Sequence, residues 1–132
     1  MSVAGKLILR NILKIRLTPY CAESVTLFSI KMTMAAEKNF ENKVKKFLKD
    51  NGCWFIKYWG GGEFTRAGIP DLLICCNGHF LGVELKGPKG KPSELQLWNI
   101  EQIKKSGGTA LVLYPDDFPQ FKELIHNLLE NS

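Results

Sequence analysis

Two acidic residues and a lysine, Asp71, Glu84 and Lys86, lie where the sequence predicts a β-hairpin. The hairpin is indicated by Asn77-Gly78, because an Asn-Gly pair between apolar runs favours a two-residue type I′ turn with positive φ at both positions. Counting outward from that turn places Asp71 directly opposite Glu84, with Lys86 on the same face. Opposed side chains lie about 5 Å apart at Cβ, so two carboxylates there repel unless a proton or a cation neutralises them. This spacing predicts a divalent metal bound by both carboxylates, with a lysine beside it.

The same residues resemble a known nuclease signature. Ile69-Pro70-Asp71 followed by Glu84-Leu85-Lys86 is similar to the PD-(D/E)XK pattern. A longer set of residues is similar to the VRR-NUC branch of that superfamily: Gly68, Val83, Ser93, Gln96, Trp98 and the pair Gly107-Gly108. Because PD and ExK are short motifs, the hairpin register and the downstream glutamine carry much of the resemblance. It covers residues 37–130.

The resemblance implies a restriction-endonuclease-like α/β fold, with an αβββαβ core and a small mixed sheet flanked by helices. It implies that Asp71, Glu84 and the backbone carbonyl of Leu85 hold the metal. Mg²⁺ and Mn²⁺ fit this site, because hard cations prefer oxygen ligands. Lys86 would orient the attacking water or stabilise the charge that develops on the phosphoryl group. Glu41 matches a first-helix glutamate that reaches the metal directly or through water; the alternative is an ordinary solvated helix residue.

Gln96 has two possible roles. The resemblance implies that it positions Lys86 or the water in the active site. Ser93-x-x-Gln96 also matches a capping box, which would explain the glutamine by helix structure alone. We expect the catalytic role.

Several further residues are expected to contact DNA phosphates. Arg66 lies in the loop that begins with Gly60-Gly61-Gly62, and Lys89 and Lys91 lie in the loop after the ExK strand. Plain connecting loops are the alternative in both cases. Weaker candidates at the end of the preceding strand are Lys57 and Tyr58.

The elements that would position this site follow from the apolar pattern. Helices are expected over residues 36–51, 93–106 and 118–129, and strands over 53–59 and 109–114 in addition to the hairpin. Apolar residues on both hairpin faces predict helices on both sides of the sheet. His79 follows the turn and is expected to be an exposed residue, not a metal ligand.

The N-terminal part of the chain differs from the rest. The chain has 132 residues, the size of one domain, and a net charge of +5. Residues 1–36 carry five basic residues against one acid, so the basic excess lies mainly outside the expected nuclease domain. We predict a poorly ordered or non-native extension over 1–35, with Met32 or Met34 as the natural start, and a nuclease domain over 36–132. A transit peptide is the alternative reading of the extension.

These features together predict a metal-dependent endonuclease that cuts DNA selectively by structure, such as branched or Holliday-junction-like DNA. The family resemblance also implies a homodimer, in which each subunit cuts one strand. The four cysteines have no CxxC spacing and are expected to be reduced thiols in the cytoplasm, and no apolar run predicts a membrane span. The alternatives are a non-catalytic DNA-binding module with the same fold, and a protein unrelated to nucleic acids that carries the motif by chance.

Overall fold

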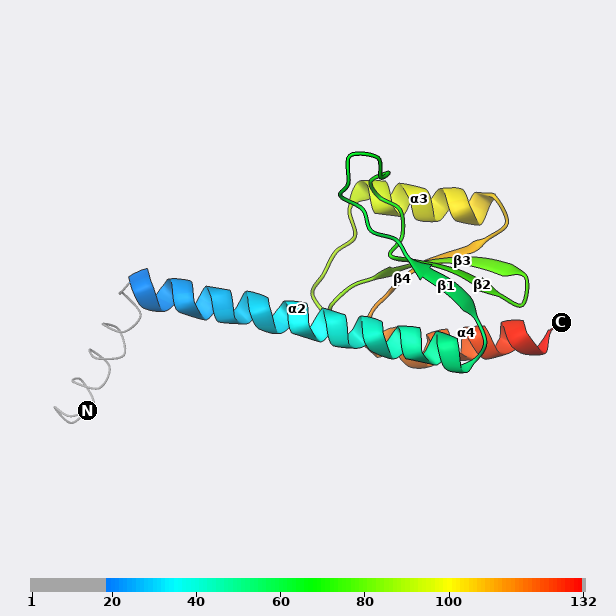
Figure 1. Ribbon diagram of the computed structural model, residues 1–132, viewed down its shortest axis with the longest axis horizontal. Coiled ribbons are helices and arrows are strands. Elements are labelled where there is room, and N and C mark those ends of the chain that lie inside the picture. The colour runs from blue at the N-terminus through cyan, green and yellow to red at the C-terminus, as the bar shows by residue number, and fades with distance from the viewer. Residues whose placement is uncertain (1–18, 132) are drawn as a thin grey trace, which may run out of the picture. The chain divides into compact units, whose positions relative to one another are not determined.

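The computed structural model describes residues 19–131, with side chains described from residue 26. The predicted extension over 1–35 lies partly outside this range. The chain divides into two units, Met1–Ala36 and Glu37–Ser132. The second unit carries the sheet and the candidate site, and its elements are shown in Figure 1. In the described part of the chain, no helix has the length and apolar character needed to cross a membrane.

The first described helix, α2 (Pro19–Asp50), begins well before the predicted start at residue 36. Proline at the first helical position is favourable, since its missing N–H would have no helical partner there. No proline or glycine follows until Gly52, so nothing in the sequence stops the helix earlier. The helix ends where Gly52 adopts a left-handed conformation, with φ of 71°.

Four strands form one mixed sheet in the order β1-β2-β3-β4: β1 (Trp54–Lys57), β2 (Leu72–Cys76), β3 (His79–Leu85) and β4 (Thr109–Leu113). The first three are antiparallel, and β4 runs parallel to β3. The crossover between β3 and β4 contains helix α3 (Glu94–Lys105). A short 3₁₀ turn, Pro115–Asp117, leads into helix α4 (Phe118–Glu130). The predicted α/β fold and its αβββαβ order are confirmed.

The hairpin register agrees with the prediction from the turn. Asn77 and Gly78 have φ of 49° and 79°, as a type I′ turn requires, and Cys76 pairs with His79. The pairing continues to Leu72 opposite Val83, in the predicted register. His79 is exposed, as expected.

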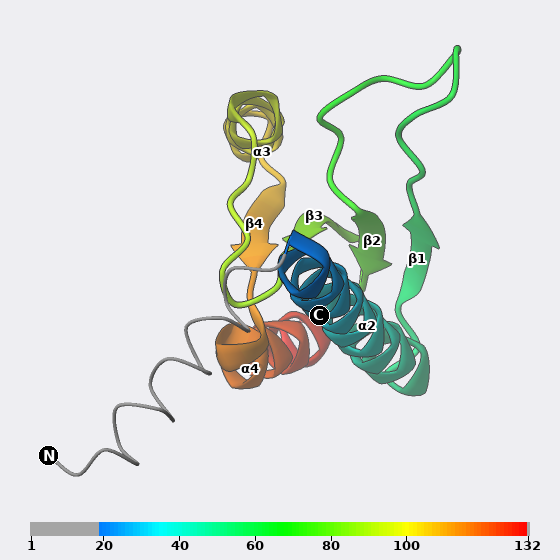
Figure 2. The same cartoon turned by 90° about the vertical axis from the view of Figure 1, so that its left-hand side faces the viewer.

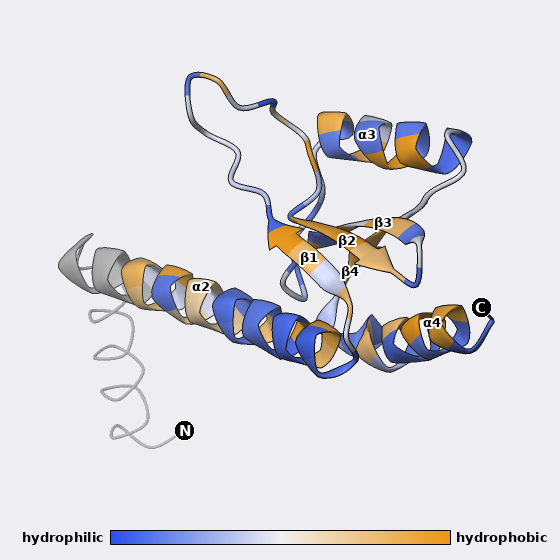
Figure 3. Ribbon diagram, turned by 45° about the vertical axis from the view of Figure 1, so that its right-hand side comes forward, coloured by the Kyte–Doolittle hydropathy of each residue, from blue (hydrophilic) through white to orange (hydrophobic). Residues whose placement is uncertain are grey.

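The two faces of the sheet have different coverings. Helix α3 lies on one face, whereas α4 and the C-terminal part of α2 lie on the other, as Figure 2 shows. The face toward α2 and α4 is the apolar core, and the strands appear as the most hydrophobic part of the domain in Figure 3. Its fully buried members include Val44, Leu48, Leu72, Ile74, Leu81, Val83 and Ile125. The alternation of side chains along β3 therefore sends Glu84 to the α3 face.

Replacing Ile125 by alanine tests whether α4 closes this core. Ile125 is fully buried in the cluster, so Ile125→Ala should lower the free energy of unfolding by about 2–5 kcal/mol through lost burial and a residual cavity. Urea denaturation followed by circular dichroism measures this. Glu123→Ala on the exposed side of the same helix is the matched control and should change stability by less than about 0.5 kcal/mol. Equal effects of the two variants would contradict the packing described.

Candidate metal-dependent nuclease site

Glu84 is the only buried charged residue in the part of the chain that the structure describes, with 1% of its surface exposed. Its Oε1 accepts hydrogen bonds from Lys86 Nζ at 2.8 Å and Gln96 Nε2 at 2.6 Å. Its Oε2 is buried with no hydrogen-bond partner. Burial raises the pKa of Glu84 and the nearby Asp71 charge adds to this, while the Lys86 ammonium opposes it. Oε1 of the carboxyl group therefore has two hydrogen-bond donors, whereas Oε2 has none.

Asp71 lies one residue before β2, at the position opposite Glu84 in the hairpin register. Its Oδ2 accepts a hydrogen bond of 3.0 Å from the backbone N–H of Leu85, and its Oδ1 accepts one of 2.8 Å from Lys57. Its backbone carbonyl accepts from the N–H of Tyr58 at 2.8 Å. These bonds fix Asp71 to both neighbouring strands, so the carboxylate is held in place beside Glu84.

Lys57 lies between two carboxylates. Its Nζ is 2.8 Å from Asp71 Oδ1 and 3.1 Å from Glu41 Oε2, and Lys45 pairs with the other oxygen of Glu41. Burial alone would raise the pKa of Glu41, but hydrogen bonds and charges from the two lysines leave it below its ordinary value. Burial would lower the pKa of Lys57, and its bonds to Asp71 and Glu41 instead raise it. Glu41 is thus connected to Asp71 through the amine of Lys57. For Lys57 to contact a DNA phosphate, as the sequence predicted, its amine would have to leave both acids.

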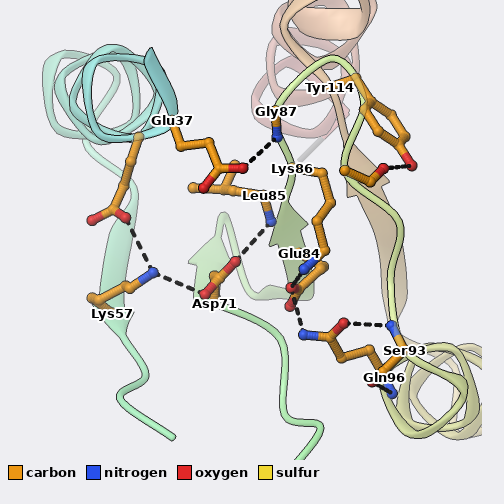
Figure 4. A network of polar contacts seen from close by, with 12 residues as sticks. Glu37, Lys57, Asp71, Glu84, Leu85, Lys86, Gly87, Ser93, Gln96 and Tyr114 are labelled. Carbon is orange, nitrogen blue, oxygen red and sulfur yellow. Dashed lines mark hydrogen bonds and ion pairs between the residues drawn. The ribbon is translucent and has the colours of Figure 1, made fainter. Parts of the chain in front are cut away.

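Gln96 contacts two different groups through its two amide atoms, as Figure 4 shows. Its Oε1 accepts from the backbone N–H of Ser93 at 2.8 Å, and its own N–H donates to Ser93 Oγ at 3.2 Å, which completes the capping box of α3. Its Nε2 donates to Glu84. The two roles considered for Gln96 from the sequence, helix capping and a place in the active site, are therefore compatible with each other.

The other predicted DNA contacts lie on two loops around the site. The Tyr58 hydroxyl accepts from the N–H of Arg66 at 2.8 Å and donates to its carbonyl at 3.2 Å, so these two residues are close together. The Arg66 side chain is exposed, as are Lys89 and Lys91 in the loop after β3. A cleft of about 530 Å³ lies beside the acids, and residues 58–71 supply most of its lining, with Gln96 completing it.

Two residues that the sequence analysis missed support the site. Glu37 Oε1 accepts from the backbone N–H of Gly87 at 3.3 Å, just after Lys86, and Asn99 Nδ2 donates to the carbonyl of Gly68 at 3.0 Å. Glu37 lies four residues before Glu41 on one face of α2, so its i,i+4 spacing was a signal that could have identified it. No sequence signal pointed to Asn99.

The residues present fit a hard divalent cation. Glu84 Oε2 is a buried carboxyl oxygen without a hydrogen-bond partner, and Asp71 supplies a second carboxyl group just before the neighbouring strand. Within the described residues, no group of three or more His, Cys, Asp or Glu side chains that could hold a metal is found. The remaining ligands would therefore have to be backbone carbonyls and water, which Mg²⁺ commonly retains.

Comparison with known proteins supports the fold. No protein-family model matches the sequence, and no curated protein matches it either. The structure is similar to a solved VRR_NUC domain, with a TM-score of 0.51 and 25% identity over 72% of this chain and 95% of that one. A second similar structure is the Holliday junction resolvase Hjc of Archaeoglobus fulgidus, with a TM-score of 0.46 and 21% identity over 58% of this chain and 66% of that one.

The structural match agrees with the motifs from which the resemblance was first drawn. It spans nearly the whole of the VRR_NUC domain. The chain therefore has a restriction-endonuclease-like fold that matches a VRR_NUC domain, and the resemblance to PD-(D/E)XK nucleases is confirmed at the level of fold.

Proposed function

We propose that this chain is a metal-dependent endonuclease that hydrolyses DNA phosphodiester bonds. The observation that carries the proposal is the carboxylate of Glu84, buried opposite Asp71 with one oxygen held by Lys86 and Gln96 and the other without a partner. A buried carboxylate oxygen without a hydrogen-bond partner costs free energy. Such an exception in a folded protein calls for an explanation, and an ion bound at the oxygen is one. A bound cation would satisfy that oxygen and relieve the repulsion between the two acids.

Asp71, Glu84 and the carbonyl of Leu85 would hold Mg²⁺ or Mn²⁺, and Glu41 would contribute through a water. The metal would supply Lewis acidity toward a phosphoryl oxygen and lower the pKa of a bound water. The protein's own groups do the positioning. Lys86 is held on Glu84. From there its ammonium would offset the negative charge that develops on the phosphoryl group.

Two contacts fix the geometry of the lysine and the glutamate. The backbone of Gly90 packs over the alkyl stem of Lys86, since a Cβ there would lie 3.3 Å from both its Cβ and its Cδ. Gln96 orients Glu84 from the capped end of α3. Groups preorganised in this way need little rearrangement during the reaction.

The proposed substrate is DNA with a branched structure, cut by a homodimer whose two sites act on two strands. The small domain carries no motif for reading bases in a groove, so selection by DNA structure is favoured over selection by sequence. Exposed Arg66 lines the cleft, and exposed Lys89 and Lys91 lie in the loop that follows Lys86. All three would contact phosphates.

A non-catalytic DNA-binding module is the second candidate, because Lys57 already neutralises Asp71 and Glu41 without a metal. Incubating the purified protein with branched, nicked and linear DNA in Mg²⁺, Mn²⁺ or EDTA separates the candidates. Cutting that EDTA abolishes supports the nuclease. Binding without such cutting supports the DNA-binding module. A protein that neither binds nor cuts DNA would refute both candidate functions.

Removing either metal-binding acid should abolish cleavage. Asp71→Asn and Glu84→Gln keep the size of each side chain but remove its charge, so cleavage of branched DNA should fall by about 100-fold or more with lost metal assistance. Initial rates under metal saturation measure this. Asp116→Asn, an exposed acid outside the site, is the control and should cut like wild type. Wild-type rates in either site variant would remove that residue from the proposed ligands.

Metal should stabilise the wild-type fold and not the Glu84→Gln variant. A ligand that binds only the folded state at about 100 times its dissociation constant adds about 2.7 kcal/mol. Thermal unfolding in Mn²⁺ and in EDTA tests this, and the wild-type midpoint should rise with Mn²⁺ while that of Glu84→Gln stays constant. The same rise in both proteins would place the metal elsewhere.

The two roles of Gln96 should separate in three variants. Gln96→Glu keeps an oxygen for the Ser93 N–H but places a carboxylate against Glu84, so activity should fall by about 10–100-fold while the cap remains. Ser93→Ala removes a cap bond away from the acids and should cost about 1 kcal/mol of stability with little loss of rate. Gln96→Ala should show both losses. Paired denaturation and cleavage measurements test the separation, and full activity in Gln96→Glu would limit the glutamine to capping.

A further inference from the structure

The loop between β1 and β2 presents an aromatic ring to solvent beside the candidate site. Phe64 is 98% exposed, and Trp59 near the start of the loop is 74% exposed. The loop projects beyond the sheet in both Figure 1 and Figure 2. A fully exposed phenylalanine gains nothing from burial, so its ring does not stabilise the domain as the core phenylalanines do.

The tip of this loop is an ordered turn. The N–H of Thr65 donates to the carbonyl of Gly62 at 3.1 Å, which makes Glu63 and Phe64 the central residues of a four-residue turn. The Thr65 hydroxyl accepts from the N–H groups of Gly61 and Gly62 at 2.9 and 2.8 Å and donates to the Gly62 carbonyl at 2.8 Å. Four hydrogen bonds thus fix a turn whose apex carries the Phe64 ring.

The neck of the loop is fixed to the site itself. Tyr58 exchanges two hydrogen bonds with the backbone of Arg66, and its own N–H donates to the carbonyl of Asp71. The loop forms a wall of the cleft that Asp71 and Gln96 also line. Gly61, Gly62 and Thr65 of the tip also line this cleft, so a nucleic-acid strand lying in it would pass beside the tip of the loop.

The chemistry of the tip suits bases and not phosphates. Residues 59–64 include three glycines, two aromatic residues and Glu63, and no lysine or arginine. Glu63 would repel a phosphate, whereas a carboxylate accepts hydrogen bonds from base amino groups and an aromatic ring stacks on any base. The basic residue of the loop, Arg66, lies at the neck, where its backbone is bonded to the Tyr58 hydroxyl.

We propose that Phe64 stacks on an unstacked nucleobase of a DNA strand that lies in the cleft lined by the loop, Asp71 and Gln96. This inference rests on the proposed nuclease function and gives it a basis for substrate selection. In continuous duplex every base is stacked on its neighbours, and inserting a ring costs unstacking energy. At a branch, a flap or a single-stranded end a base face is already free, so the ring favours these substrates.

The test compares two DNAs of the same sequence, a linear duplex and a duplex with splayed single-stranded arms. Affinities are measured by fluorescence anisotropy in EDTA, which prevents metal-dependent cutting. Phe64→Ala should bind the splayed DNA about tenfold more weakly while its affinity for linear duplex stays within about twofold, as expected for the loss of one base–aromatic stack. Phe64→Trp should keep wild-type affinity for both, because it retains an aromatic face.

Trp54→Ala is the matched control, because Trp54 is an exposed aromatic residue at the opposite end of β1 from Lys57. It should bind both DNAs like wild type. The proposal is overturned if Phe64→Ala binds splayed DNA normally, if both DNAs lose affinity equally, or if Trp54→Ala shows the same selective loss. A change of oligomeric state in Phe64→Ala that accounts for the loss would assign the ring to a protein contact and also overturn it. Absence of EDTA-sensitive cutting by the wild type refutes the nuclease, while the binding comparison tests the stacking separately.

Discussion

The buried carboxylate of Glu84 is the constraint on which the site depends. Moving an ion out of water costs several kcal/mol even after relaxation, and the protein offsets that cost at one oxygen only, with Lys86 and Gln96. The second oxygen remains buried without a partner. The raised pKa of Glu84 is the electrostatic consequence of this arrangement. A domain of this size has a modest core, so such a cost indicates a site shaped by function more than by stability.

The two faces of the sheet carry different kinds of residue. The face toward α2 and α4 carries the main cluster of buried apolar residues, and the α3 face carries Glu84. Gln96 of α3 connects the start of the helix to this acid, because the same side chain completes the helix cap and donates to Glu84. Lys57 has a similar linking role at the other side, between Glu41 on α2 and Asp71 before β2.

Local rules predicted the hairpin well. Asn77-Gly78 demands positive φ at both positions, and this alone set the register that brings Asp71 opposite Glu84. The same rules placed α3 and α4 to within a few residues, because caps and apolar periodicity are local signals. They failed at the start of α2, where the absence of helix-breaking residues after Pro19 mattered more than the apolar stripe that begins at Phe40.

The sequence by itself determined the turn and the pairing of the two acids, since both follow from backbone preferences over a few residues. The fold class followed from the motif resemblance, together with the apolar residues on both faces of the hairpin. Only the tertiary structure decided which oxygen of Glu84 is paired, that Lys57 stands between Glu41 and Asp71, and that Glu37 and Asn99 support the neighbouring loops. These contacts join segments up to 50 residues apart in the chain. Their geometry depends on how helices pack on the sheet, and no local pattern specifies the position of a side-chain atom across such a distance.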